Sequence, residues 1–189
     1  MKQMVLAVGL VASAFAASAN EYKPAMQSYL ESEISAWAHS PVLLDAIRAQ
    51  NIQTSGYDQG EIDQLDQAWR SEVGQPSSEI ISNVLENEAA QFLREQMEQS
   101  GGIISEVFTM DARGLNVSAS DVTSDYWQGD EAKFQETYGA GPGAVFIDEV
   151  EFDESSQTYQ GQVSIVIVDP DSNIPIGAIT IGLNAEALL

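Results

Sequence analysis

The chain has 189 residues, of which 44% are apolar, and its 29 acidic against 7 basic residues give a net charge of −22 with histidine neutral. This size and apolar content suffice for one domain with a true core, which excludes a disordered tail. The charge excludes electrostatic binding of nucleic acid or anionic membranes, and the lack of cysteine excludes disulfides, thiolate metal sites and a cysteine nucleophile. The negative charge has two explanations: it keeps the protein soluble, or it attracts cationic ligands or a basic partner.

Residues 1–19 have the pattern of a secretory signal peptide. Lys2 forms a small basic region, an apolar run follows from Met4 to Ala16, and Ala17-Ser18-Ala19 is a small-residue cleavage site. We predict cleavage after Ala19 and a periplasmic location. No later apolar run reaches the roughly 20 residues that a membrane-spanning helix needs, so we expect no membrane span after cleavage.

Residues 20–100 are predicted to be helical. Ser40-Pro41 ends a first helix of about 17 residues and begins a new one, because proline disfavours helical conformation in the residue before it. Residues 51–60 are polar and predict a loop, before a short helix over 61–72. Ser77 or Ser78 then caps a longer helix that continues to about Gln99. The first helix has apolar residues at steps of three and four, which form a buried stripe: Tyr22, Met26, Tyr29, Leu30, Ile34 and Trp37.

Residues 101–189 are predicted to form a sheet. Helices followed by strands are typical of an α+β fold, so we expect long N-terminal helices packed on a five-stranded antiparallel sheet. The apolar run Val163–Val168 is typical of a central strand covered on both faces, whereas Val145–Phe152 alternates and lies nearer an edge. The five strands are predicted at residues 103–110, 115–120, 144–152, 159–168 and 174–183.

The segment Asp121–Gly143 is the remaining cover for the second face of this sheet, since one helix layer covers only one face. Within it, Thr123–Lys133 combines aromatic, hydroxyl and charged side chains in an irregular stretch between strands. We interpret this stretch as the lining or lid of a pocket.

Three segments carry a resemblance to a known family. Glu106–Ser120, with its Asp111-Ala112-Arg113-Gly114 turn, looks like a first hairpin, Thr123–Lys133 looks like an aspartate-aromatic pocket segment, and Pro175–Leu183 looks like a closing strand. Asp66-Gln67-Ala68-Trp69 is similar to the helical part. Together they resemble the single Cache sensor domain, the extracytoplasmic PAS-like module of bacterial receptors.

The resemblance implies that a long N-terminal helix packs on one sheet face and that small metabolites bind on the other face, beneath Asp125-Tyr126-Trp127. Two features depart from the family. The last predicted strand ends shortly before Leu189, without a following membrane helix, so we expect action through a partner. The amino-acid signature of double Cache domains, an arginine after a tyrosine and then a tryptophan, is not evident.

Seven residues are the candidate ligand-binding set. Each also has a structural alternative: Tyr126 and Trp127 as packing residues, Asp125 as a helix cap, and Lys133 as a solvated residue or a partner of Glu149. The candidate set is Asp125, Tyr126, Trp127, Lys133, Phe146, Glu149 and Ser164.

Catalysis, cofactors and metals find little support in the sequence. Asp169–Asn173 imitates the start of a calcium loop, but Ile174 and Thr180 stand where glycine and glutamate are needed. We therefore predict a non-enzymatic, periplasmic module that binds a small-molecule metabolite, with a membrane receptor or sensor kinase as a possible partner and a possible homodimer through the N-terminal helix. The alternative is a structural or interaction protein that docks on a membrane receptor, with its pocket filled by side chains.

Overall fold

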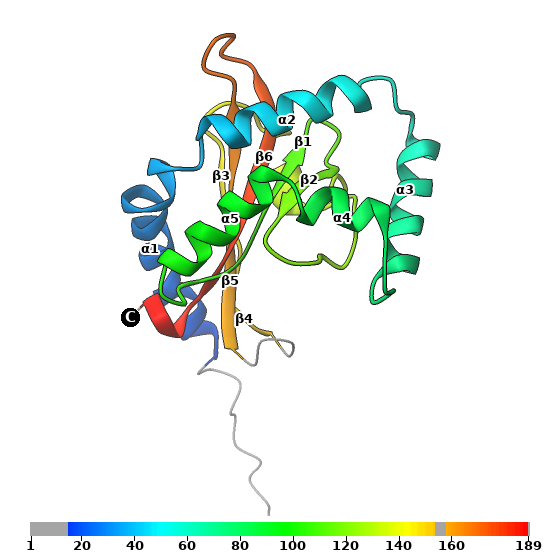
Figure 1. Cartoon of the computed structure of the whole chain (residues 1–189). Helices are drawn as coiled ribbons and strands as arrows, with labels where there is room; N and C mark the ends of the chain where they lie inside the picture. Colours follow the sequence, from blue (N-terminus) through cyan, green and yellow to red (C-terminus); the bar gives the residue numbers. More distant parts are fainter. Residues whose placement is uncertain (1–14, 154–157, 189) are drawn as a thin grey trace, which may run out of the picture.

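The computed structural model describes residues 15–153 and 158–188 (Figure 1). Helices occupy the first half of the chain: α1 Phe15–Ser32, the 3-10 helix η1 Ile34–Ala36, α2 Pro41–Thr54, α3 Gln59–Glu72, α4 Glu79–Leu85 and α5 Glu88–Gln99. The second half holds β1 Ile104–Asp111, β2 Asn116–Ala119, α6 Ala132–Gln135, β3 Val145–Ile147, β4 Glu151–Asp153, β5 Thr158–Val168, β6 Pro175–Asn184 and the 3-10 helix η2 Glu186–Leu188. Helices α1 to α5 thus precede all the strands in the chain. The predicted signal peptide lies largely outside the described residues.

The strands form one antiparallel sheet in the order β2-β1-β6-β5-β3, with β4 also paired to β5. The predicted α+β fold is confirmed, with six strands in place of five. The predicted strand 144–152 is divided into β3 and β4, both of which pair with β5. Ile147 and Val150 both pack against the helix-side core although they are three residues apart, and an unbroken strand would place them on opposite faces. Because the strand is interrupted between them, both side chains can reach the same core.

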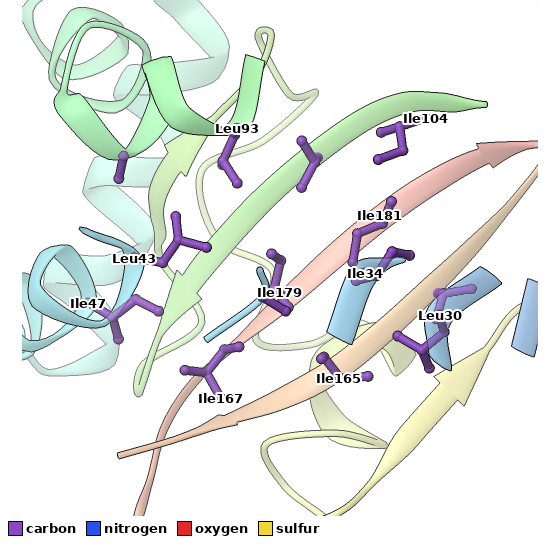
Figure 2. Packing of buried hydrophobic residues seen from close by; sticks show 14 of the residues in the cluster. Leu30, Ile34, Leu43, Ile47, Leu93, Ile104, Ile165, Ile167, Ile179 and Ile181 are labelled. Carbon is purple, nitrogen blue, oxygen red and sulfur yellow. The ribbon is translucent and has the colours of Figure 1, made fainter. Parts of the chain in front are cut away.

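Helices α1, α2 and α5 cover one face of the sheet. Leu30 of α1, Ile34 of η1 and Leu43 of α2 lie over the sheet in Figure 2, in one cluster with Ile179 and Ile181 of β6. The predicted stripe is confirmed, since Met26, Leu30 and Ile34 are buried while the other members pack at its margin. The core on this face is therefore filled by aliphatic side chains.

The helix boundaries follow local capping chemistry. Pro41 occupies the first turn of α2, as its missing N–H permits. Asp58 and Glu61 form a reciprocal capping box at the start of α3. The long helix predicted up to Gln99 is wrong in its continuity: it is divided into α4 and α5, because the side chain of Asn87 caps a new helix by accepting from Ala90 N.

The second face of the sheet carries a separate cluster with Trp69 and Tyr126 at its centre, together with Phe108, Met110 and Phe134. Tyr126 and Phe134 belong to the segment 121–143, which therefore covers this face as predicted. Helix α3 stands at the side of the molecule in Figure 1, and it contributes Trp69 to the cluster. None of the described helices is long and apolar enough to cross a membrane.

Candidate functional site

A cavity of about 600 Å³ lies between the second face of the sheet and the segment that covers it. Its floor comes from β1 and β5, and its other wall comes from residues 121–133. The floor residues are Ser105, Glu106, Phe108, Gln160 and Gln162. The covering residues are Asp121, Val122, Thr123, Ser124, Gln128 and Lys133.

The register of the sheet builds the floor. Glu106 of β1 and Gln162 of β5 both lie opposite Gly182 of β6. A Cβ atom at Gly182 would stand 2.6 Å from Glu106 Cγ, so the glycine leaves the room over β6 that this side chain occupies. Gln162 Nε2 donates to Glu106 Oε1 at 2.8 Å across the glycine, and Ser105 Oγ donates to Gln160 Oε1 at 2.8 Å. Polar groups of the floor are thus held in fixed positions.

Lys133 supplies a positive charge to the cavity. Its side chain is only 15% exposed, and its Nζ atom lies 2.8 Å from Glu131 Oε2. The same nitrogen lies 5.5 Å from the centroid of the Phe108 ring, within the range of a cation–π contact. A lysine held between a carboxylate and an aromatic face places a positive charge at the cavity wall, where it can attract an anionic group.

Helix α3 holds the covering segment through its backbone. Asp66 Oδ1 accepts from Tyr126 N at 2.9 Å and from Trp127 N at 3.1 Å, and Trp69 Nε1 donates to Thr123 O at 2.9 Å. Asp66 is buried, so these contacts are shielded from water. The position of the cavity wall therefore depends on α3.

The turn between β1 and β2 anchors the same segment from the opposite side. Gln128 N donates to Gly114 O at 2.8 Å, and Asn116 N donates to Tyr126 O at 3.0 Å. Gly114 has a φ of +80°, and a Cβ atom there would come 2.6 Å from Gly129 Cα. The two segments approach so closely that Gly114 cannot be replaced without moving the wall.

The structure places the aromatic pair of the candidate set away from the cavity. Tyr126 is buried and stacks on Trp69 with ring centroids 5.5 Å apart. Trp127 Nε1 donates to Arg113 O at 2.9 Å, and its ring packs on the cluster around Trp69. Both side chains thus make structural contacts, which was the alternative interpretation.

Asp125 borders the site indirectly, because its Oδ1 atom accepts from Nε2 of the cavity residue Gln128 at 2.7 Å. Gln128 itself is only 2% exposed. Among the predicted residues within the covering segment, Lys133 alone lines the 600 Å³ cavity.

The three strand residues of the candidate set do not line this cavity. Ser164 is fully buried, with its Oγ atom 2.8 Å from Thr180 Oγ1. Phe146 lies opposite Ser164 on β3, and Glu149 lines a smaller hollow beside β4. Lys133 pairs with Glu131, not with Glu149.

Sequence reasoning missed most of the floor. Gln160 and Gln162 interrupt the apolar pattern at the start of β5, and Ser105 and Glu106 are polar at the start of β1. Because both strands pair with β6 in antiparallel fashion, their starts meet at one end of the sheet. The polar residues at the start of both strands were therefore the signal from which the cavity floor could have been predicted.

Metal ligands do not gather at the site. Within residues 15–153 and 158–188, no group of three or more His, Cys, Asp or Glu side chains is arranged to hold a metal ion. The chemistry that these residues offer is therefore hydrogen bonding and charge pairing.

Comparison with known proteins gives no match to a family model and no match to a curated protein. Among solved structures, the chain is similar to the sensor domain of the Vibrio cholerae histidine kinase DctB, with 14% identity, 92% of this chain and 58% of that chain covered, and a TM-score of 0.44. It is similar to the sensory domain of the Campylobacter jejuni chemoreceptor Tlp3, with 13% identity, 88% and 65% covered, and a TM-score of 0.42. It is also similar to the ligand-binding domain of the Pseudomonas aeruginosa amino acid chemoreceptor PctC, with 13% identity, 78% and 60% covered, and a TM-score of 0.41.

The chain spans between half and two thirds of the length of each of these three solved structures. The three are described as a sensor domain, a sensory domain and a ligand-binding domain.

Proposed function

We propose that this protein is a periplasmic, non-enzymatic sensor module that binds a small polar metabolite in the 600 Å³ cavity. The observation that carries the proposal is the placement of the nearly buried Lys133 in the wall of a polar hollow on the second face of the sheet. Its volume falls within the range of about 300–1,000 Å³ that small-molecule sites occupy. The periplasmic location rests on the predicted signal peptide.

The lining favours a ligand that carries a carboxylate. Within the part of the chain that the structure describes, Lys133 is the one positively charged side chain that lines the cavity. A ligand carboxylate can share or replace its contact with Glu131. Glu106 and Asp121 lie on the floor and on the covering segment, so an amino or hydroxyl group on the same ligand has acceptors available. The fixed amides of Gln128 and Gln162 can orient such a molecule.

The alternative function, an interaction protein whose pocket is filled by side chains, leads to a different expectation for the second face. A filled face would leave no hollow beneath residues 121–133. The cavity supports the binding function over this alternative, and a membrane receptor or sensor kinase remains the partner that we propose for signal output.

A thermal-shift screen of the purified protein against amino acids, organic acids, amines and purines tests the proposal. A ligand at about 100 times its dissociation constant adds about 2.7 kcal/mol to the free energy of unfolding, and each kcal/mol raises the midpoint by about 2–4 °C for a domain of this size. We expect a carboxylate-bearing compound to raise the midpoint by about 5–10 °C on this basis.

Lys133→Met and Lys23→Met form a matched pair for this screen, because both remove one lysine charge and Lys23 is exposed on α1. We expect Lys133→Met to abolish most of the ligand-induced shift and Lys23→Met to leave it unchanged. An equal loss of the ligand-induced shift in both variants would favour the interaction protein. The same holds if no compound shifts the midpoint and no small molecule is released on denaturation.

A further inference from the structure

A second cavity, of about 370 Å³, lies among α2, α3 and α4. Its lining includes Tyr57, Leu65, Glu72, Glu79, Ile80 and Tyr126, and none of its residues lines the 600 Å³ cavity. The two hollows are therefore separate sites.

Tyr126 presents a polar group to the second cavity without a protein partner. The residue is only 9% exposed, and its hydroxyl makes no hydrogen bond to any residue that the structure describes. Its ring is fixed by the stack on Trp69, and its backbone is fixed by Asp66. Burial, followed by the nearby Asp111 and Tyr57, raises the pKa of this hydroxyl, so it remains a neutral donor and acceptor. A hydroxyl that is held in place at the cavity wall, without a partner among the described residues, is a group that a ligand in the cavity can hydrogen-bond.

The charge and shape of the lining select the ligand. Glu72 and Glu79 bring negative charge, and among the described residues no lysine, arginine or histidine lines the cavity. Leu65 and Ile80 give it apolar wall, and the rings of Tyr57 and Tyr126 offer faces that attract cations. These two carboxylates would repel an anion, whereas a cation with a short hydrocarbon body would meet both carboxylates and apolar wall.

We propose that this cavity is a second binding site, specific for a small organic amine. Its ammonium group pairs with Glu79 and Glu72 and donates to the Tyr126 hydroxyl oxygen, and its hydrocarbon body packs on Leu65 and Ile80. Because Tyr126 belongs to the segment that covers the 600 Å³ cavity, occupancy of the second site fixes one end of that cover.

Amide NMR spectra of the purified protein, titrated with butylamine at neutral pH, test this proposal. We expect saturable shifts of the amides of Thr54, Tyr57 and Asn83, with smaller effects at Ser105 and Gln162 on the floor of the first cavity. Butanol has the same hydrocarbon body without the charge, so it should bind more weakly by at least several fold.

Three variants assign the contacts. Glu79→Gln removes one carboxylate charge, and Tyr126→Phe removes the hydroxyl but keeps the stacked ring, so each should weaken butylamine binding by about three- to tenfold. Glu98→Gln makes the same charge change on the exposed side of α5, away from the cavity, and should bind butylamine as the parent does.

Several results would overturn the proposal. Shifts that do not saturate, or that appear only around Ser105 and Gln162, would mean that the second cavity holds only water. Equal binding of butanol and butylamine, or unchanged affinity in Glu79→Gln, would reject a site for amines. If Tyr126→Phe does not fold, the difference in butylamine affinity between Glu79→Gln and Glu98→Gln still tests the proposal.

Discussion

Asp66 is the residue on which the cover of the 600 Å³ cavity depends most. Its single Oδ1 atom accepts from two backbone N–H groups, those of Tyr126 and Trp127, and its Oδ2 atom pairs with Arg70 at 2.7 Å. Asp66→Ala leaves both N–H groups without a partner in a buried setting. We expect the free energy of unfolding to fall by about 3 kcal/mol, measured by urea denaturation.

Asp63→Ala is the control for this change, because Asp63 is exposed on the same helix. It should cost less than about 0.5 kcal/mol. A similar loss in both variants would mean that helix propensity, and not the two backbone contacts, accounts for the effect of Asp66.

Asp169 joins the β5–β6 turn to α2. Arg48 Nε donates to Asp169 Oδ2 at 2.7 Å, and this bond, with backbone N–H groups of Ser172 and Asp171, holds the pKa of the Asp169 carboxyl well below its usual range. A carboxyl whose pKa is depressed by folding stabilises the protein above the pKa of the unfolded chain, about 3.9, and this stabilisation is lost as the pH falls further through the folded pKa.

Arg48→Met should therefore lower the melting midpoint most above about pH 5, and the difference from the parent protein should shrink below about pH 4. Thermal melts over this range measure it. Arg113→Met is the control, since Arg113 donates to the carbonyl oxygen of Ser55 and not to a carboxylate. A difference for Arg48→Met that is constant with pH would show that Asp169 is not its partner.

At the scale of elements, Asn87 divides what the sequence predicted as one helix. Its side chain caps α5 through Ala90 N, and its amide donates to Val117 O of β2 at 2.9 Å. The apolar periodicity continues through residues 79–99, so periodicity could not reveal the division, and a mid-helix asparagine was its only local signal.

Asn87→Ala should lower the free energy of unfolding by about 1–2 kcal/mol, because it removes the cap of α5 together with the link to β2. Chemical denaturation measures this loss. Gln91→Ala, on the exposed face of the same helix, should change it by less than about 0.5 kcal/mol. Equal effects would indicate that α4 and α5 behave as one continuous helix in solution.

The strands show the same limit of prediction. Positions 103–110, 159–168 and 174–183 were predicted within one or two residues, because each run is mostly apolar and bounded by polar turns. The run 144–152 was not, since its division depends on Ile147 and Val150 reaching one core, which is a tertiary requirement. For the same reason the sequence could not show which face of the sheet Phe146 and Glu149 occupy, because this depends on where that strand breaks.

At the scale of the whole molecule, the location of the 600 Å³ cavity could be predicted while most of its lining could not. One helix layer covers one sheet face, so residues 121–143 had to cover the other, and this follows from chain order alone. Which side chains of that segment point inward depends on its anchors at Asp66 and Gly114, which are distant in sequence. Lys133 was predicted because it is the one lysine in the segment, whereas Gln128 had no such distinction.

The net charge of −22 makes the stability of the whole molecule depend on salt. Repulsion among 29 acidic residues favours expanded states, and 7 basic residues offset little of it. Added salt shortens the Debye length from about 30 Å at 0.01 M to about 8 Å at 0.15 M, so repulsion across the domain is screened while short contacts such as Arg48 with Asp169 lose less. We expect the melting midpoint to rise with NaCl over this range.

Sucrose at matched osmolality separates this effect from solute exclusion, which also raises the midpoint. Charge screening predicts a rise in NaCl that is steep below 0.15 M and flattens above it, whereas sucrose should act in proportion to its concentration. A midpoint that falls as NaCl is added would mean that the few ion pairs outweigh the repulsion of the acidic surface. The carboxylates near Lys133 would then have to be regarded as stabilising partners and not as groups that a ligand displaces.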